Sequence, residues 1–224
     1  MRQIRVTFFG DSTCVGQGVS LYKGWVTQVA AALHNMSDEI GRDVIVANSS
    51  INGRTTRQAL EDMPYHIQSQ PIDIIIVQFG LNDCNYWETD RGMPRVSNMA
   101  FIANLNEIID RCLKFNAYKI LVNTNHPTSR IEEIMPHTQI SYEASNAEYN
   151  EAIRAVCASR ENDVSLQDIG LHFAKLTDSG ENIKNLLLED GLHPSEAGHD
   201  SYFNVMYPAI AKWVKQLANE GGRL

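Results

Sequence analysis

The chain has 224 residues, of which 43% are hydrophobic, and it carries a formal net charge of −8 at pH 7. A chain of this length buries enough surface for one sizeable hydrophobic core. The acidic balance and the lack of a basic patch argue against a nucleic-acid partner, and no apolar stretch is long enough to span a membrane. Because no linker, repeat or low-complexity tract interrupts the sequence, we predict a single domain over residues 1–224.

The N-terminus leads almost directly into an apolar run and lacks the three regions of a signal peptide. We therefore expect either a cytoplasmic protein or an exported one whose signal has been removed. None of the four cysteines forms a C-x-x-C pair, which excludes a zinc ribbon or a thioredoxin motif and makes free thiols the expectation. Two of them, Cys14 and Cys84, follow polar turns, and we expect their thiols to lie near each other and to be accessible.

The first predicted strand is the apolar run of residues 4–9, which stops at Gly10-Asp11-Ser12. Glycine allows a sharp turn that leaves the next side chains at the carboxyl end of the strand, where ligands bind in open α/β sheets. Ser12 is therefore a candidate nucleophile, provided that a base and an oxyanion site reach it. The alternative is that Asp11 or Ser12 only caps the following helix.

The rest of the chain alternates predicted helices and strands. The helices, recognised by apolar side chains at helical spacing, cover residues 22–34, 57–69, 98–115, 145–160 and 195–217. The strands, recognised by short β-rich apolar runs, cover residues 43–48, 72–79, 119–125 and 163–169. Residues 72–79 are apolar almost throughout, which is typical of a strand covered on both faces of a parallel sheet. Five strand–helix repeats predict a three-layer α/β sandwich with a five-stranded parallel sheet.

Individual residues give further predictions about where these helices begin and bend and where long loops lie. Thr55 or Thr56 is expected to cap the helix that follows them, and Pro64 is expected to kink or break that helix. The polar segments 85–97 and 128–144 are predicted loops, and a loop as long as 128–144 is usually functional or disordered.

Polar turns follow several of the predicted strands and carry Ser12, Gly53 and Asn82, and a turn before the last helix carries Asp190 and His193. In a parallel sheet such turns open on one edge, so these residues can converge on one site. A serine hydroxyl needs a base, for which histidine suits neutral pH, and a carboxylate three residues earlier can orient the imidazole. The backbone N–H groups of Ser12 and Gly53 and the side-chain amide of Asn82 can stabilise an oxyanion.

These motifs resemble the four blocks of the SGNH hydrolases, also called the GDSL esterase/lipase family, in the same order across nearly the whole chain. The matching segments are Gly10-Asp11-Ser12, Asn52-Gly53, Gly80-Leu81-Asn82-Asp83 and Asp190-Gly191-Leu192-His193. The resemblance implies a flavodoxin-like sandwich that hydrolyses carboxylic esters without a cofactor. One departure is Thr13, which stands where the common motif has leucine and makes a lipid-directed activity less expected.

We therefore expect a serine esterase that cleaves small-molecule esters, with small or short acyl groups, through an acyl-enzyme on Ser12. Asp83 is expected to brace its own loop by bonding backbone rather than to take part in the chemistry. The residues expected to contact substrate are Arg54, Tyr86, Trp87 and His126. No metal site is expected, because His193 and His199 lack the spacing of a zinc motif.

Two alternatives stay open. An acyltransferase would use the same acyl-enzyme with an alcohol in place of water. A non-catalytic phosphate- or nucleotide-binding module would use residues 10–18 as an anion cradle, although the chain contains no G-x-x-x-x-G-K-[ST] run and this function leaves His193 unexplained. A homo-oligomer is compatible with the sequence, with the two long loops as contact segments.

Overall fold

The computed structural model describes residues 3–220 and contains a parallel sheet of five strands in the order β2-β1-β3-β4-β5. The strands are β1 (Ile4–Gly10), β2 (Val44–Asn48), β3 (Ile74–Gln78), β4 (Lys119–Asn123) and β5 (Ser165–Gln167). This strand order is that of flavodoxin-like folds, in which the chain reverses direction across the sheet beside β1. The predicted fold class, a flavodoxin-like α/β sandwich with a five-stranded parallel sheet, is confirmed.

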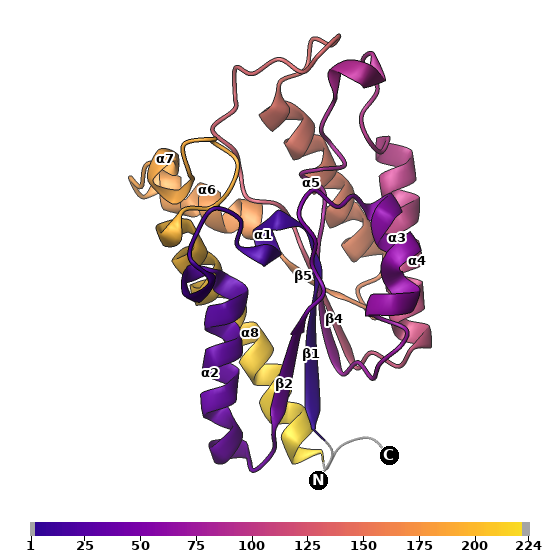
Figure 1. Cartoon of the computed structure of the whole chain (residues 1–224), viewed down its shortest axis with the longest axis vertical. Helices are drawn as coiled ribbons and strands as arrows, with labels where there is room; N and C mark the ends of the chain where they lie inside the picture. Colours follow the sequence, from indigo (N-terminus) through magenta and orange to yellow (C-terminus); the bar gives the residue numbers. More distant parts are fainter. Residues whose placement is uncertain (1–2, 221–224) are drawn as a thin grey trace.

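Helices cover both faces of the sheet (Figure 1). One layer holds α2 (Trp25–Ile40), α6 (Ile169–Asp178) and α8 (Glu196–Asn219), and the other holds α3 (Thr56–His66), α4 (Asn98–Lys114) and α5 (Tyr142–Ser159). Four shorter helices lie in the connections: α1 (Ser12–Val15), η1 (Leu21–Lys23), η2 (Glu88–Asp90) and α7 (Ile183–Leu186). The carboxyl ends of the strands meet α1 and the longest loops at the end of the molecule opposite the start of β1 and the end of α8 (Figure 1).

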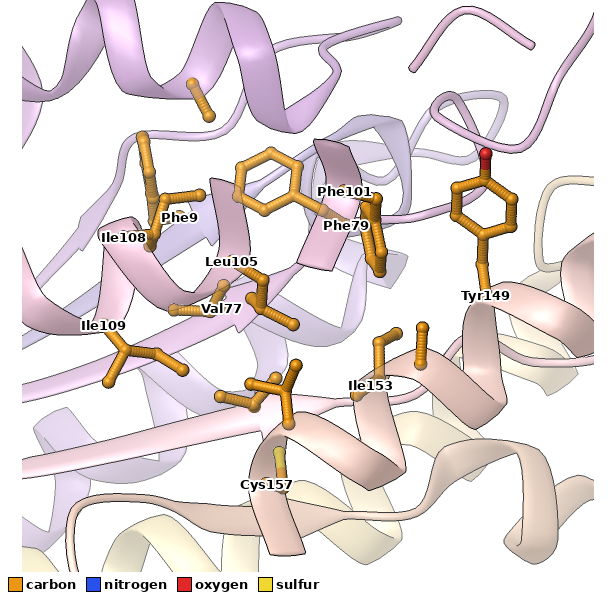
Figure 2. Packing of buried hydrophobic residues seen from close by; sticks show 14 of the residues in the cluster. Phe9, Val77, Phe79, Phe101, Leu105, Ile108, Ile109, Tyr149, Ile153 and Cys157 are labelled. Atoms are coloured by element: carbon orange, nitrogen blue, oxygen red, sulfur yellow. The ribbon is translucent and has the colours of Figure 1, made fainter. Parts of the chain in front are cut away.

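Two hydrophobic cores lie on opposite faces of the sheet because neighbouring side chains of a strand point to opposite sides. In β1, Phe9 joins the core under α3, α4 and α5, whereas Phe8 joins the core under α2 and α8. Figure 2 shows Phe9 and Val77 of the sheet in one cluster with side chains of α4, such as Leu105, and of α5, such as Ile153. The central strands are therefore buried on both faces, as the continuous apolar run of β3 predicted.

Several helix boundaries differ from those predicted. Helix α2 continues past residue 34 to Ile40, because Met36 adds another buried contact, and it ends where Gly41 adopts a left-handed conformation with φ 65°. Helix α3 accommodates Pro64 and ends two residues later at His66. Helix α5 begins at Tyr142 rather than at residue 145. Helices α6 and α7 were not predicted, although Ile169 and Phe173 of α6 are buried and lie four residues apart, which is the spacing of one helix face. Helix α7 is only four residues long.

The expectation that the thiols of Cys14 and Cys84 are accessible was wrong. The thiols of Cys14 and Cys84 are buried, so they are not accessible, and burial raises the pKa of both well above the usual value. All four cysteines are free, as expected. Within residues 3–220, no helix is both long and apolar enough to cross a membrane.

Candidate active site

Ser12 lies where β1 gives way to helix α1. Gly10, the last residue of β1, has no room for a side chain, because a Cβ there would lie 2.8 Å from the carbonyl oxygen of Gln78. Asp11 is the N-cap of α1 and accepts a hydrogen bond from the Thr13 amide at 3.0 Å. The capping interpretation is therefore correct for Asp11, and it coexists with a serine held in the first turn of α1. The side chain of Ser12 faces the turn that carries His193.

Ser12, His193 and Asp190 form a continuous chain of hydrogen bonds. Nε2 of His193 lies 3.0 Å from Oγ of Ser12, and Nδ1 of the same ring lies 2.6 Å from Oδ2 of Asp190. Since a carboxylate only accepts hydrogen bonds, Nδ1 carries the proton and Nε2 is the acceptor that faces the serine hydroxyl. The ring is thus in the tautomer that a general base needs.

Asp190 orders its own turn as well as the imidazole. Its Oδ1 accepts hydrogen bonds from the backbone amides of Leu192 and His193, both at 2.9 Å. Partial burial opposes ionisation of Asp190, but the hydrogen bonds from the imidazole and the two amides outweigh it and lower the pKa of this carboxyl. Asp190 is therefore a carboxylate at neutral pH and stabilises a positively charged imidazole beside it.

The turn that carries Asp190 and His193 is clamped by the segment that follows β4. Three consecutive carbonyl oxygens of the turn each accept one hydrogen bond from this segment. The donors are Nε of Arg130 to Asp190, the amide of Ser129 to Gly191 and Nε2 of His126 to Leu192, at 2.9, 2.9 and 2.7 Å. A Cβ on Gly191 would lie 2.4 Å from Oγ of Ser129, so only glycine permits this close approach. The clamp fixes the turn against a second strand end.

A cavity of about 150 Å³ opens beside Ser12. Its lining residues are Ser12, Gln17, Gly53, Leu81, Asn82, Leu192 and His193. The structure therefore brings together the serine, the histidine and the two further residues expected to stabilise an oxyanion. Gln17, Leu81 and Leu192 were not predicted to line the cavity, although Leu81 and Leu192 lie within two of the four motifs and Gln17 follows Ser12 by five residues.

Gly53 and the neighbouring Asn82 loop are fixed by buried polar contacts. Gly53 adopts a left-handed conformation with φ 75°, and the helix that follows it begins with a capping box between Thr55 and Gln58. Asp83 accepts hydrogen bonds from the amide and the hydroxyl of Thr56, at 2.9 and 2.5 Å. The prediction that Thr55 or Thr56 caps this helix is confirmed. Asp83 does bond a backbone amide, but at the start of α3 rather than in its own loop.

Arg54 does not have the surroundings of a substrate-binding residue, and this expectation needs correction. Its side chain is 1% exposed, lies over the ring of Phe9, donates to the carbonyl of Ser49 at 2.7 Å and pairs with Asp62 at 3.1 Å. Burial lowers the pKa of this guanidinium, and Asp62 opposes the shift. Arg54 thus supports the loop of Gly53 from the core side.

The two aromatic residues of the 85–97 loop also lie away from the cavity at Ser12. Tyr86 is half-buried and packs against the core under α3, α4 and α5. Trp87 is 50% exposed and lines a separate cleft, with the guanidinium of Arg95 over its ring. Neither side chain lines the cavity, so the expectation that they form its wall is not met.

His126 is fully buried and does not line the cavity either. Nε2 faces the Leu192 carbonyl, so it carries the proton, and Nδ1 accepts from the hydroxyl of Tyr202 at 2.7 Å. Burial lowers the pKa of His126 to about 4. The residue expected to contact substrate is instead a neutral support of the turn that carries His193.

His126 gives a testable pH dependence. Unfolded, its imidazole gains a proton near pH 6.5, whereas the folded protein resists protonation down to about pH 4, so stability falls as the pH falls between these values. His126→Gln keeps an N–H donor for Leu192 and removes the titration. We expect the variant to lose about 2–3 kcal/mol less free energy of unfolding than the wild type between pH 7 and pH 4. Urea denaturation at each pH measures this.

The control is His34→Gln, which changes an exposed histidine on α2. The buried carboxyls of Asp11 and Asp83 titrate in the opposite sense, because burial raises the pKa of each to about 6, but they are common to all three proteins. Parallel pH profiles for the wild type and His126→Gln would contradict the assignment of a neutral, buried His126.

No group of three His, Cys, Asp or Glu side chains suited to a metal ion occurs among residues 3–220. His199, which was weighed as a partner of His193, is buried in α8. Its Nδ1 accepts the amide of Trp25 at 3.3 Å, at the start of α2, where Gly24 provides no side-chain cap. His199 therefore has a structural contact of its own.

Comparison with known proteins supports the resemblance inferred from the motifs. Residues 8–200 match the model of the GDSL-like lipase/acylhydrolase family. An arylesterase from Vibrio mimicus is 32% identical over 79 residues, which cover 35% of this chain and 38% of the arylesterase. The curated relative is thus matched over less than half of its length.

Solved structures share the fold at low sequence identity. An acetylxylan esterase, Axe2, from Geobacillus stearothermophilus superposes with a TM-score of 0.72 at 20% identity, covering 92% of this chain and 94% of that one. A lipase/acylhydrolase from Enterococcus faecalis gives a TM-score of 0.71 at 20% identity, over 94% and 96% of the two chains. Since the family model covers most of the sequence, the chain belongs to the GDSL-like lipase/acylhydrolase family.

Proposed function

We propose that this protein is a serine esterase that removes small acyl groups through an acyl-enzyme on Ser12. The observation that carries the proposal is the hydrogen-bond chain from Asp190 through His193 to Ser12, with links of 2.6 and 3.0 Å. A carboxylate, an imidazole and a serine hydroxyl, bonded in this order, are the groups that nucleophilic acyl transfer requires. Family membership independently favours an ester-cleaving enzyme over a non-catalytic phosphate-binding module.

The reaction follows from these contacts in two halves. Nε2 of His193 takes the hydroxyl proton as Oγ of Ser12 attacks the ester carbonyl, and the carboxylate of Asp190 stabilises the imidazolium. The imidazolium then gives its proton to the departing alcohol as the bond between the carbonyl carbon and the alcohol oxygen breaks. In the second half His193 activates a water, which attacks the acyl carbon and releases the acid and the free serine.

The tetrahedral intermediates need donors for their oxyanion. Three residues that line the cavity are proposed for this role, through the backbone amides of Ser12 and Gly53 and the side-chain amide of Asn82. A preorganised donor of this kind lowers the barrier by roughly 3 kcal/mol. Three such donors act together on the charge that develops only during the reaction.

The size of the cavity supports a small acyl group. About 150 Å³ is the volume of a cavity that accommodates benzene, so acetyl and short aliphatic acyl groups fit, whereas a long chain must extend into solvent. Of the three similar proteins named above, the acetylxylan esterase is named for a small acyl group, which agrees with a cavity of this size. Because the proposed groups come from both ends of the chain, we also propose that it acts as one catalytic domain.

The proposal is tested with a fluorophosphonate probe and a series of p-nitrophenyl esters. We expect covalent labelling at Ser12, located by peptide mass spectrometry, and turnover that is highest for acetate, lower for butyrate and much lower for octanoate. Adding alcohols as competing acceptors and analysing the products separates hydrolysis from acyl transfer. Labelling elsewhere, or none, together with no turnover of any ester would refute the serine esterase.

A further inference from the structure

We propose that Arg95 is a positioning residue of the oxyanion site, which it organises from outside the cavity. This inference rests on the proposed function. The guanidinium donates two hydrogen bonds, from Nη1 to Oδ1 of Asn82 at 3.2 Å and from Nη2 to the carbonyl of Gly53 at 3.1 Å. One side chain therefore connects two of the three groups assigned to the oxyanion, which come from loops that are distant in sequence.

The contact with Asn82 decides which end of the amide faces the reaction. A guanidinium only donates hydrogen bonds, so Oδ1 must be the atom next to Arg95. On the other side, Nδ2 donates to the buried carboxyl of Asp11 at 3.4 Å. One N–H of the amide is engaged by Asp11, and the second is left for the oxyanion. A flipped amide would instead present an oxygen lone pair to the developing negative charge.

The charge of Arg95 also suits this position. Two buried carboxyl groups lie next to the oxyanion site: Asp11, beside Asn82, and Asp83, the next residue in the chain. Negative charge on either would oppose formation of an oxyanion. A partly buried guanidinium bonded to both oxyanion-site loops offsets that effect, because its charge is screened less than that of an arginine in open solvent.

The guanidinium is itself held in place. Its Cζ lies over the ring of Trp87, 4.2 Å from the ring centroid, and the backbone amide of Arg95 donates to the carbonyl of Asn85 at 2.9 Å. Both Nη atoms of the guanidinium donate a hydrogen bond at the same time. Lysine has a single ammonium group and no planar guanidinium. It therefore cannot make both hydrogen bonds and also keep the contact with the Trp87 ring.

Arg95 can be reached from solvent by small molecules. It lines a cleft of about 400 Å³ that is separate from the cavity at Ser12. The other lining residues are Arg57, Trp87, Asp90, Met93, Pro94 and Ser97. Truncating the side chain at position 95 therefore leaves a space that free guanidinium can enter, which makes chemical rescue the appropriate test.

The experiment compares Arg95→Ala with the wild type on p-nitrophenyl acetate. We expect kcat to fall on the order of 100-fold while KM changes by less than about 3-fold, because the lost organisation matters mainly in the transition state. Guanidinium chloride, well below denaturing concentration, is expected to restore part of kcat, whereas ammonium chloride at equal ionic strength is not. Fluorophosphonate labelling of Ser12 should slow in parallel, since the bound phosphonate oxygen occupies the same site.

Two further variants keep the result interpretable. Arg95→Lys should fold and retain the charge yet remain well below the wild type in kcat, which separates hydrogen-bond geometry from charge and serves if Arg95→Ala does not fold. Arg57→Ala removes an arginine of the same cleft that has no contact with Asn82 or Gly53 among the described residues, and it should leave kcat unchanged. Thermal melting checks that each variant is folded.

The inference is overturned if a folded Arg95→Ala or Arg95→Lys keeps the kcat of the wild type, if only KM rises, or if guanidinium and ammonium act alike on Arg95→Ala. These outcomes differ from failure of the proposed function, which would show as retained turnover in Ser12→Ala. With Ser12→Ala inactive and Arg95→Ala fully active, the esterase stands and only the role of Arg95 is lost.

Discussion

Replacing Ser12 with alanine is expected to remove ester hydrolysis while leaving the fold intact, with a loss of kcat on the order of 10⁶-fold. The hydroxyl is the only atom of the side chain with a proposed role, and its partner is Nε2 of His193 at 3.0 Å. Alanine is a good helix former, and the cap that Asp11 provides for α1 does not depend on the serine oxygen. The free energy of unfolding should therefore change little.

The measurement is the steady-state hydrolysis of p-nitrophenyl acetate, with the melting temperature and circular dichroism as checks on folding. Ser69→Ala is a matched control, because Ser69 is exposed, lies three residues after the end of α3 and donates its hydroxyl to the nearby carbonyl of Tyr65. Its activity should equal that of the wild type. Turnover by Ser12→Ala within a few-fold of the wild type would eliminate the acyl-enzyme on Ser12.

Asp190→Asn is the second large expected effect, a loss of roughly 10⁴-fold in kcat. The asparagine can keep Oδ1, which accepts from the amides of Leu192 and His193, so the turn should stay folded. It places an N–H group where Oδ2 meets Nδ1 of the imidazole at 2.6 Å. The ring then accepts at Nδ1 and carries its proton on Nε2, which leaves no base facing Ser12.

The same substitution separates catalysis from stability. Asp190→Ala removes the acceptor for two backbone amides as well, so it should lower the melting temperature, whereas Asp190→Asn should lower kcat with a much smaller change in melting. Glu189→Gln neutralises the neighbouring exposed carboxylate of the same turn and should leave both properties unchanged. If Asp190→Asn and Glu189→Gln have the same kcat, Asp190 does not orient the base.

The sequence by itself determined the fold class, the order of the five strands and most of the helices that cover them, because these depend on local patterns. Continuous apolar runs such as β3 identify strands that are buried on both faces, and helical spacing identifies the layers that cover them. It also determined the candidate reacting groups, since four short motifs retain their residue types and order. Helix ends were less predictable: α2 continues past residue 34 because a buried contact of Met36 favours the extra turns.

Only the tertiary structure decided what the remaining polar side chains do. Arg54 and His126 have the composition of substrate-binding groups, but burial against Phe9 and Tyr202 makes them supports of the loops around the cavity. Arg95 lies in a polar loop with no motif, and its link to Asn82 exists only because two loops fold against each other. A side chain's type is local information, whereas its partners are set by packing between segments far apart in the chain.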